Sequence, residues 1–432
     1  MEFKKIILEN CVNDIIDYRG KTPKKLKGEW NEKGTFRAVS AKNIKNMQLV
    51  NLESLKKVDN ELYKKWMKKE VSKNDILLTS EAPLGESLFW DSDEKIVLSQ
   101  RVFGLKPNTD IVNPKYLFAY LQTPKFKHEL TSRESGTTVT GIRRKELEKT
   151  IIEVPSQNIQ KFIGDLFYIT NKKIKNNQNI IANLEELSQT LFKHWFVDFE
   201  FPDENGNSYK SSGGEMIDSE LGIIPKLWNI KRLSDICIVT DGTHDSPKQT
   251  TEGYPLVTSK HLNKFDIDFS TTKLISKEDF TSINQRSKVE KNDILLSMIG
   301  TIGKLHFVNS NSINYAIKNV GLIKTSQIDY STYIYNYINS QNTIDYIQQR
   351  TSGSTQQYIS LKNLRSIPII SPTSNILKTY IDRNNNFFEK INQKIKENVK
   401  LIELRNTLLP KLMSGELEIP DDIEVNEDEL SI

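Results

Sequence analysis

Short apolar runs follow polar turns at two distant places in the chain. Lys73–Asp75 (KND) precedes Ile76–Leu78, and the same three letters at Lys291–Asp293 precede Ile294–Leu296. A polar turn that leads into a continuous apolar run predicts a buried β-strand. We therefore predict one strand at each place, within regions of mixed α/β structure.

An aromatic stretch lies downstream of each predicted strand. It reads YLFAYL at Tyr116–Leu121 and YIYNYI at Tyr333–Ile338. The apolar positions alternate as in a buried helix, so we expect these residues in the core. A platform on which nucleic-acid bases stack is the alternative interpretation.

Two long segments repeat apolar residues at helical spacing. Ile159–His194 and Ile376–Leu409 hold 36 and 34 residues, which correspond to helices of about 54 and 51 Å. Pro410 cannot donate an intrahelical hydrogen bond, so the second helix should kink or end near Leu409.

The leucines of both segments fall on one helical face. Residues three and four apart lie on the same side of a helix, and such a stripe packs against another helix. We therefore expect an antiparallel coiled coil. The residues assigned to helix or subunit packing are Leu184, Leu187, Leu191, Trp195, Phe196, Leu401, Leu404 and Leu408.

These features belong to an internal duplication. Four pairs of similar stretches keep an offset of 217 or 218 residues: Phe36–Ile44 with Tyr254–Leu262, Val71–Ser80 with Val289–Met298, Ser135–Leu147 with Ser352–Leu364, and Leu184–Trp195 with Leu401–Leu412. A period of this length indicates two domain-sized copies and not a stacked array. The predicted fold is α+β: two homologous mixed α/β domains separated by two long helices, with a pseudo-two-fold internal repeat.

Charge is unevenly distributed along the 432 residues. The net charge is +4, but residues 416–432 hold eight acidic residues and no lysine or arginine, which leaves +12 on the rest. A basic body favours a polyanionic partner, although lysine-rich solvated surfaces also occur in structural proteins. Charge alone places nucleic acid only modestly ahead of other partners.

The sequence predicts a cytoplasmic protein without a membrane span. No uninterrupted apolar run reaches about 18 residues, and the N-terminus lacks an apolar signal core with a cleavage site. Cys11 and Cys237 occupy the opening segments of the two copies, which favours two buried core thiols over a disulfide. Five scattered histidines give no metal-ligand spacing, so we expect no metal site.

Motifs for catalysis are weak. Gly300–Lys304 (GTIGK) lacks the spacing and the hydroxyl residue of a phosphate-binding loop, so we interpret it as a structural turn. Asn113–Tyr116 is faintly similar to the motif that holds a target adenine in methyltransferases. Lys115 replaces the second proline of that motif, and no glycine-rich cofactor loop precedes it. We therefore predict that the chain is not an enzyme.

Three longer stretches carry a resemblance to a known family. LFKHWFVDFEFP (Leu191–Pro202) resembles its central segment, SELGIIPKLWNIKRLSDI (Ser219–Ile236) the start of its second recognition domain, and LRNTLLPKLMSGEL (Leu404–Leu417) its C-terminal segment. With the KNDILLS and SGSTQQYISLKNL stretches added, essentially the whole chain resembles the specificity (S) subunit of type I restriction-modification systems. The first copy departs from the pattern, because it has no counterpart of Leu221–Pro225.

The resemblance implies a domain organisation and a function. Target-recognition domains would occupy residues 1–157 and 217–373, a central helix and linker 158–216, and a C-terminal helix with an acidic tail 374–432. The chain would read a bipartite double-stranded DNA target, one half-site per domain, with an unread spacer set by the helices.

The resemblance also implies partners and cofactors. The expected partners are two modification (methyltransferase) subunits and the restriction (translocase and nuclease) subunits. S-adenosylmethionine, ATP and Mg²⁺ would reside in those partners, and this chain itself would hold no cofactor.

DNA contacts are expected on loops, with basic side chains on phosphates and amides or arginines on base edges. The candidates are Arg19, Lys21, Lys24, Lys25, Lys42, Thr137, Thr138, Arg143 and Arg144 in the first domain, and Thr243, His244, Lys248, Lys260, Ser354, Thr355, Gln356, Gln357 and Tyr358 in the second. For any one lysine, a solvated surface is an equally good interpretation. His244 equally suits a hydrogen bond that stabilises its own loop.

Two other functions fit the same pattern. One is a stand-alone bipartite DNA-binding regulator, which would not co-purify with a methyltransferase subunit. The other is a structural coiled-coil scaffold whose domains bind proteins, which would not protect two patches of DNA.

Overall fold

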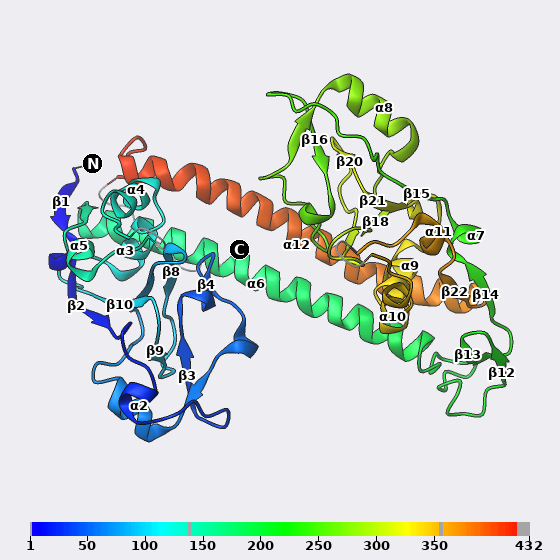
Figure 1. The fold of residues 1–432 in the computed structure, drawn as a ribbon, viewed down its shortest axis with the longest axis horizontal. Helices are drawn as coiled ribbons and strands as arrows, with labels where there is room; N and C mark the ends of the chain where they lie inside the picture. The colour runs from blue at the N-terminus through cyan, green and yellow to red at the C-terminus, as the bar shows by residue number, and fades with distance from the viewer. Residues whose placement is uncertain (1, 137–139, 354–356, 421–432) are drawn as a thin grey trace. The chain divides into compact units, whose positions relative to one another are not determined.

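The computed structural model describes residues 2–136, 140–353 and 357–420 (Figure 1). The chain divides into two compact units. The first comprises Met1–Asn176 and Val399–Ile432, and the second comprises Asn177–Asn398. We call the part of each unit outside the two long helices its head.

The first head is built on a four-stranded antiparallel sheet. Its strand order is β2 (Val12–Asp17), β10 (Val102–Pro107), β7 (Ile76–Ser80), β8 (Leu84–Phe89). A smaller sheet has the order β6 (Lys57–Val58), β3 (Phe36–Val39), β9 (Val97–Leu98), and two strand pairs complete the head: β1 (Lys4–Ile7) with β11 (Ile151–Val154), and β4 (Ile44–Lys45) with β5 (Gln48–Leu49). Its helices are α1 (Leu8–Cys11), α2 (Asn60–Trp66), α3 (Pro114–Tyr120), α4 (Pro124–Ser132) and α5 (Arg144–Glu148).

The second head repeats the four-stranded sheet, the smaller sheet and the β1–β11 pair of this topology, whereas its β12–β13 pair has no counterpart in the first head. Its four-stranded sheet has the order β15 (Val239–Asp241), β21 (Val320–Ile323), β18 (Ile294–Ser297), β19 (Leu305–Phe307), and its smaller sheet β17 (Lys273–Ile275), β16 (Tyr254–Val257), β20 (Ala316–Ile317). The strand pairs are β14 (Asn229–Arg232) with β22 (Pro368–Ser371), and β12 (Met216–Ser219) with β13 (Gly222–Pro225). Its helices are α7 (Leu233–Ile236), α8 (Lys277–Ser287), α9 (Ser331–Ile338), α10 (Gln341–Gln349) and α11 (Leu361–Arg365). The duplication predicted from the sequence is therefore present in the fold.

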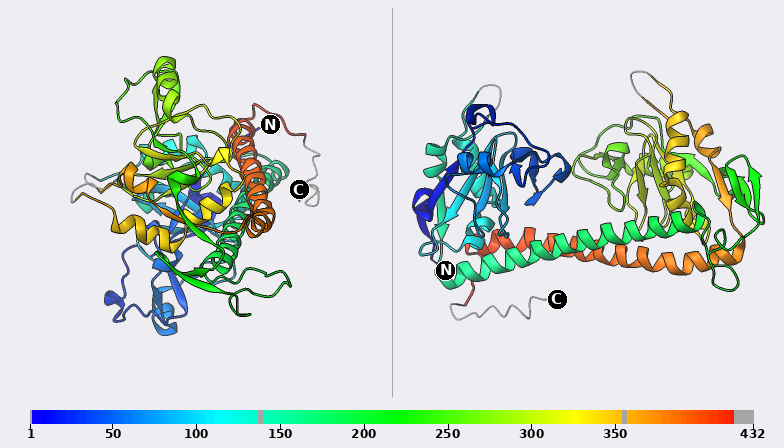
Figure 2. Two further views of the ribbon diagram at one scale, coloured as in Figure 1. Left: turned by 90° about the vertical axis from the view of Figure 1, so that its right-hand side faces the viewer. Right: turned by 90° about the horizontal axis from the view of Figure 1, so that it is seen from below.

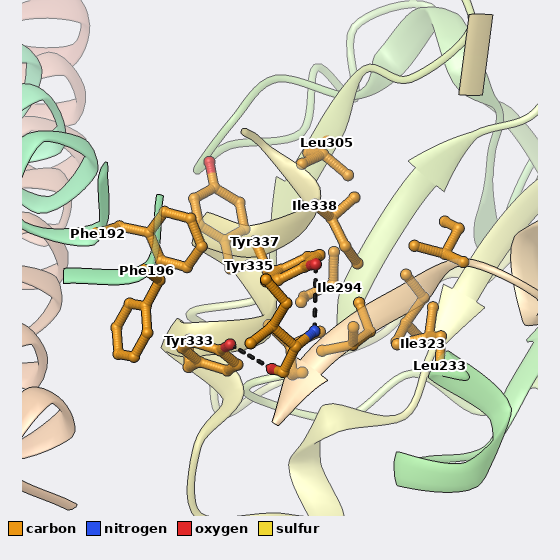
Figure 3. Close-up of a cluster of buried hydrophobic side chains, with 14 of the residues drawn as sticks. Phe192, Phe196, Leu233, Ile294, Leu305, Ile323, Tyr333, Tyr335, Tyr337 and Ile338 are labelled. Atoms are coloured by element: carbon orange, nitrogen blue, oxygen red, sulfur yellow. Dashed lines mark hydrogen bonds between the residues drawn. The ribbon is translucent and has the colours of Figure 1, made fainter. Parts of the chain in front are cut away.

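The aromatic stretches form buried helices, as expected. Tyr116 and Tyr120 of α3 and Tyr333 and Tyr335 of α9 are all at most 2% exposed. Figure 3 shows Tyr333, Tyr335 and Tyr337 among apolar side chains of the second head, where the Tyr333 hydroxyl donates to the Ile370 carbonyl at 2.6 Å. Core packing, and not base stacking, is the role of these rings.

Two long helices contribute to both units. Helix α6 runs from Gln157 to Phe196, and α12 from Ser374 to Ser414. Within each unit they lie side by side and antiparallel (Figures 1 and 2). Two buried amide and hydroxyl contacts join them in the second unit: Asn177 Nδ2 donates to Asn398 Oδ1 at 2.9 Å, and Ser188 Oγ donates to Asn384 Oδ1 at 2.7 Å.

Both helices supply side chains to the core of each head. The core of the first unit contains Ile163 and Phe167 from α6 together with Leu412 and Met413 from α12. The core of the second unit contains, from the two helices, Phe192, Trp195, Phe196, Tyr380, Phe388 and Ile391. Trp195 and Phe196 therefore pack in the helix pair and head, as expected.

Two of the leucines assigned to helix or subunit packing are largely exposed in the chain, and their packing against another subunit stays a prediction. Leu187 is 53% exposed and Leu404 is 48% exposed, whereas Leu184, Leu191 and Leu408 pack against the cores. Three- and four-residue spacings drift around a straight helix, so a long stripe does not stay on one contact face. Leu401 lies at intermediate exposure.

The alternative in which α12 ends near Leu409 was wrong. The helix includes Pro410 and continues to Ser414. Leu412 and Met413 beyond the proline are 5% and 6% exposed within the core of the first unit. Their burial offsets the roughly 3 kcal/mol that an interior proline costs a helix.

Each KND turn is closed by a buried ion pair at the same place in both heads. Lys106 Nζ lies 2.7 Å from Asp75 Oδ2, and Lys324 Nζ lies 2.7 Å from Asp293 Oδ2. In each case the carboxylate also accepts a backbone N–H from the turn, from Ser72 at 2.8 Å or Glu290 at 2.7 Å. Burial raises the pKa of Asp75 by more than Lys106 lowers it. The pair therefore holds the turn onto the sheet at a considerable desolvation cost.

Replacing Lys324 by methionine should strongly destabilise the second unit. The Asp293 side chain is fully buried, so the change leaves an unpaired carboxylate without water, at a cost of about 3–5 kcal/mol. The free energy of unfolding from urea denaturation measures the effect. Lys106→Met is the matched control and should cost less, because the side chains of Lys106 and Asp75 are 26% and 7% exposed, against 10% and 0% for Lys324 and Asp293. Equal losses would contradict this view of the two pairs.

His306 replaces a leucine at the equivalent position of the other head. It lies on β19 opposite Leu295, where the first head has Leu88 opposite Leu77. The ring is 4% exposed, and its Nδ1 lies 2.8 Å from the Asn263 carbonyl. Burial lowers the pKa of His306 to about 4, against the weaker effect of its backbone hydrogen bonds.

The stability of the second unit should fall as the pH drops from 7 to 5. The unfolded histidine binds a proton near pH 6.5 and the folded one only near pH 4, so acid favours unfolding by roughly 2 kcal/mol over this range. His306→Leu copies the residue of the first head and should remove this part of the pH dependence. Urea denaturation at both pH values measures it, and an unchanged slope in the variant would refute the assignment.

Candidate nucleic-acid interface

The strand order brings distant loops together at one end of each main sheet. Neighbouring strands are antiparallel, so the end of β2, the start of β10, the end of β7 and the start of β8 meet at a single edge. We call this the first loop edge, and it comprises residues 17–21, 40–43, 80–84, 99–102 and 141–143. The second loop edge, built in the same way, comprises residues 241–246, 258–261, 297–304, 317–320 and 357–358.

Backbone hydrogen bonds link the segments of each edge. At the first, Ser80 N–H donates to the Arg101 carbonyl at 2.9 Å, and Ile142 N–H donates to the Ser80 carbonyl at 2.9 Å. At the second, Asn319 N–H donates to the Thr243 carbonyl at 3.1 Å, and Gly300 N–H donates to the Gln357 carbonyl at 3.1 Å. Each edge is thus a set of loops that hydrogen bonds join to one another on a sheet, which is the kind of surface on which binding residues occur.

Arg19 and Lys21 have internal partners at the first loop edge. The Arg19 guanidinium donates to both carboxylate oxygens of Asp17 at 2.8 and 2.9 Å, stacks 3.9 Å from the centre of the Phe103 ring, and donates to the Ile142 carbonyl at 3.1 Å. Burial raises the pKa of Asp17, but the hydrogen bonds and charge of Arg19 together lower it by more. The pKa of Asp17 therefore lies below its usual value. Lys21 Nζ donates to the Trp66 carbonyl at 2.6 Å, and burial lowers its pKa. These contacts favour a structural role for both residues.

The other candidates of the first head are exposed. Lys24 and Lys25 lie on a 3-10 helix, where Lys25 Nζ donates to the Gly20 carbonyl at 2.8 Å. Lys42 follows β3 at the loop edge, and Arg143 caps α5. Arg144 pairs with Glu148 at 2.7 Å. All five remain candidates for phosphate contacts, while Thr137 and Thr138 lie outside the described residues.

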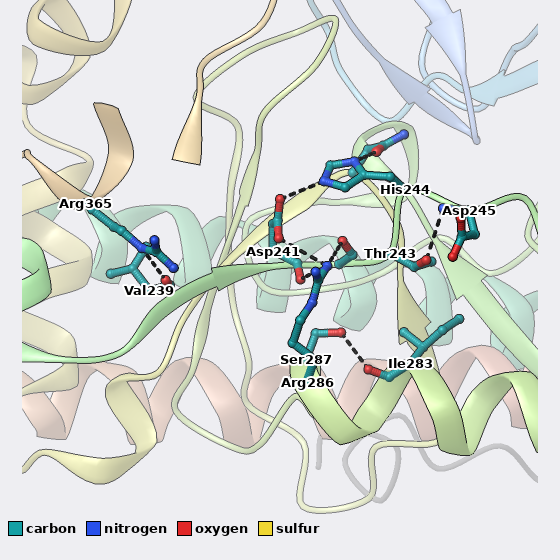
Figure 4. Close-up of polar contacts among 11 residues, drawn as sticks. Val239, Asp241, Thr243, His244, Asp245, Ile283, Arg286, Ser287 and Arg365 are labelled. Atoms are coloured by element: carbon teal, nitrogen blue, oxygen red, sulfur yellow. Dashed lines mark hydrogen bonds and ion pairs between the residues drawn. The ribbon is translucent and has the colours of Figure 1, made fainter. Parts of the chain in front are cut away.

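A histidine links two loops at the second loop edge. His244 Nδ1 lies 2.7 Å from Asn319 Oδ1, and its Nε2 lies 3.0 Å from Asp241 Oδ2 (Figure 4). Arg286 Nη2 lies 3.3 Å from the other Asp241 oxygen and donates to the Gly242 carbonyl at 2.8 Å. Thr243 Oγ1 accepts the Asp245 N–H at 3.1 Å. These contacts directly support the interpretation that His244 stabilises its own loop.

The remaining candidates of the second head lie on its surface. Lys248, Lys260, Gln357 and Tyr358 are exposed, and Lys260 occupies the position equivalent to Lys42. Tyr358 bridges Ser352 by reciprocal backbone hydrogen bonds of 2.9 and 2.8 Å. Ser354, Thr355 and Gln356 lie outside the described residues.

A cleft that was not predicted from the sequence lies at the first loop edge. It has a volume of about 330 Å³ and is lined by residues including Trp30, Lys42, Lys56, Gln100 and Arg101. Only Lys42 was predicted. The available signal was the position of Gln100 and Arg101, two polar residues between the apolar runs that form β9 and β10. Their neighbours across the cleft depend on strand order, which the sequence does not give.

Other classes of site find no support in the described part of the chain. Within residues 2–136, 140–353 and 357–420, no group of three or more histidine, cysteine, aspartate or glutamate side chains is arranged to hold a metal ion. Among the helices of that same portion, none has the length and apolar character needed to cross a membrane. Both cysteines are free thiols.

Comparison with known proteins identifies the family. The sequence profile of the type I restriction modification DNA specificity domain matches twice, at residues 9–186 and 225–401. The type I restriction enzyme MjaIX specificity subunit of Methanocaldococcus jannaschii is 26% identical and is aligned over 93% of this chain and 91% of its own length. The HindI specificity subunit of Haemophilus influenzae is 25% identical over 81% of this chain and 88% of that protein.

A solved structure shares the fold. The crystal structure of the S subunit of a type I restriction-modification system from M. genitalium superposes with a TM-score of 0.59 at 15% identity, covering 95% of this chain and 96% of that one. The two profile matches together span most of the sequence, one in each copy. The chain belongs to the type I restriction modification DNA specificity domain family and carries two copies of that domain.

Proposed function

We propose that the chain is the sequence-specificity subunit of a type I restriction-modification complex and reads a split DNA target, one half-site with each head. The observation that carries this proposal is the pair of specificity-domain matches, one on each copy of a duplicated fold. The two heads share a frame but present different side chains at their loop edges, so they would read different half-sites.

The charges of the loop edges support contact with DNA. In the first head, Lys42 and Arg143 at the loop edge and Lys24 on the neighbouring 3-10 helix are exposed, and they have no carboxylate partner among the residues that the structure describes. Cations of this kind neutralise phosphates and position a protein on a duplex, while base-edge contacts supply the sequence preference. We assign the exposed basic residues to phosphates and the polar residues of the loop edges to bases.

The long helices would set the spacer between the half-sites. Helix α6 has 40 residues, or about 60 Å of continuous helix, and it passes from the first unit into the second. Two heads that read one groove of B-DNA need centres about one helical turn, or about 34–36 Å, apart, or a multiple of that distance. A continuous antiparallel helix pair would fix such a distance.

The chemistry would belong to partner subunits. We propose that two modification subunits bring S-adenosylmethionine and methylate the target, and that restriction subunits bring ATP and Mg²⁺ for translocation and cleavage. The chain itself would be non-catalytic and would act in the cytoplasm, where the DNA is. Mapping methylated positions across the genome of the cell tests the whole proposal, because a split motif reports both half-sites and the spacer at once.

Lengthening both helices should lengthen the spacer. Twenty-one residues (three heptads) inserted after Asn176 in α6 and twenty-one before Val399 in α12 add about 32 Å of helix, close to one turn of B-DNA and equal to about nine base pairs at 3.4 Å per step. The methylated motif should keep both half-sites and gain that spacer. An insertion in α6 alone is the control and should abolish binding, because it breaks the pairing with α12. An unaltered spacer in the double insertion would reject the role of the helices.

Removing charge at Lys24 and Lys25 should weaken binding to every DNA sequence alike. Each phosphate contact contributes about 0.9 to the slope of log affinity against log salt, so Lys24→Gln with Lys25→Gln should reduce that slope by up to about 1.8. Fluorescence anisotropy over a salt series measures it. Lys231→Gln removes the charge of an exposed lysine in the second head and is the matched control, which should leave the salt slope unchanged. A slope unchanged by the double substitution would exclude phosphate contacts there.

A further inference from the structure

The cleft at the first loop edge is concave, polar and positively charged. About 330 Å³ in volume, it falls at the lower end of the size range of small-ligand pockets. Lys42, Lys56 and Arg101 line it, and its lining includes no carboxylate. Lys42 and Lys56 have no carboxylate partner among the described residues, and lysines of this kind attract phosphate.

The adjacent residues Gln100 and Arg101 both line this cleft. Both are exposed, and the Gln100 side-chain amide has no hydrogen-bond partner in the described portion of the chain. Arg101 Nε lies 3.0 Å from Glu81 Oε1, and both side chains are partly exposed. Because the Arg101 and Ala41 backbones are tied to the sheets, the two side chains extend from a fixed base.

The backbone conformation of Arg101 favours a functional role for its side chain. Arg101 has φ of 66°, in the left-handed region, and Asn319 at the equivalent position of the second head has φ of 54°. Asparagine adopts this conformation at lower cost than arginine. An arginine at a strained position beside a cleft favours function over local stability.

The second head uses the equivalent pair differently. Lys318 Nζ donates to Ser246 Oγ at 2.6 Å, and Asn319 Oδ1 lies 2.7 Å from the His244 ring. Both side chains thereby bind the loop that follows β15. In the first head, Lys21 of the corresponding loop bonds instead to the Trp66 carbonyl, and Gln100 is exposed.

We propose that Gln100 and Arg101 are the residues that determine the specificity of the first head, which rests on the proposed function. One strand of the duplex lies along the cleft, with its phosphates on Lys42 and Lys56. Gln100 and Arg101 then reach the base edges of the adjoining major groove. Glutamine pairs with the N6 and N7 edge of adenine and arginine with the O6 and N7 edge of guanine, so the half-site of this head contains both bases.

Selection from a pool of random duplexes tests the assignment, with the full-length chain in the complex with which it purifies. Gln100→Leu should relax the adenine position alone, and Arg101→Asn should relax the guanine position alone, each by roughly 5- to 150-fold in discrimination. Asparagine suits the left-handed backbone, so the second variant should fold. The other half-site and the spacer should stay the same in both variants.

Two controls separate base reading from other effects. Asn60→Leu removes another exposed amide, on α2 and outside the cleft, and should leave the motif unchanged. Lys42→Gln should lower affinity for all sequences and reduce the salt slope without changing the motif. The midpoint of thermal unfolding checks that each variant is folded.

The outcomes distinguish the inference from the proposed function. A split motif in the wild type that neither Gln100→Leu nor Arg101→Asn alters would overturn the inference and leave the proposed function standing. The same holds if the variants lose affinity uniformly or change the other half-site. A wild-type chain that selects no split motif would overturn the proposed function and this inference with it.

Discussion

The core of each head is completed by a helix that begins or ends in the other sequence copy. The first core needs Leu412 and Met413 from the end of α12, and the second needs Phe192 and Phe196 from the end of α6. Burying side chains of this size stabilises each unit by about 1.5–3 kcal/mol per residue. Each head therefore buries part of its apolar surface against both helices, so we expect the pairing of α6 with α12 to stabilise both heads.

The sequence correctly predicted the turns, strands and helices that local sequence patterns encode. The KND turns, the strands behind them, the buried aromatic helices and the two long helices all follow from turn chemistry and apolar spacing. The sequence-based prediction failed where contacts between distant residues determine the structure. Pro410 lies inside a helix because Leu412 beyond it is buried. Leu187 is exposed because no head or helix residue covers that face within the described part of the chain. The loop edges depend on strand order, which spacing does not contain.

The two heads separate the residues that hold the frame from those that face outward. Asp17 and Asp241 end equivalent strands, opposite Phe103 and Gly321, and each anchors the loop that follows. Asp17 does so through Arg19, whereas Asp241 uses His244 and Arg286. The anchoring carboxylate is the same and its partners differ, so each loop can follow its own path without altering the sheet. Candidates such as Arg19 thus have roles in the frame, which sequence alone did not distinguish from DNA contacts.

This separation explains how one fold accommodates two different surfaces. The pair of a lysine with the aspartate of the KND turn occurs in both heads, and removing the lysine would leave the buried aspartate without its partner. Exposed positions at the loop edges carry little of the folding energy, since a surface change usually alters stability by less than about 0.5 kcal/mol. Gln100–Arg101 in one head and Lys318–Asn319 in the other therefore occupy the same backbone with different chemistry. A frame fixed by buried contacts leaves the side chains at its loop edge free to differ, and a molecule with two such frames can hold two independent surfaces on one chain.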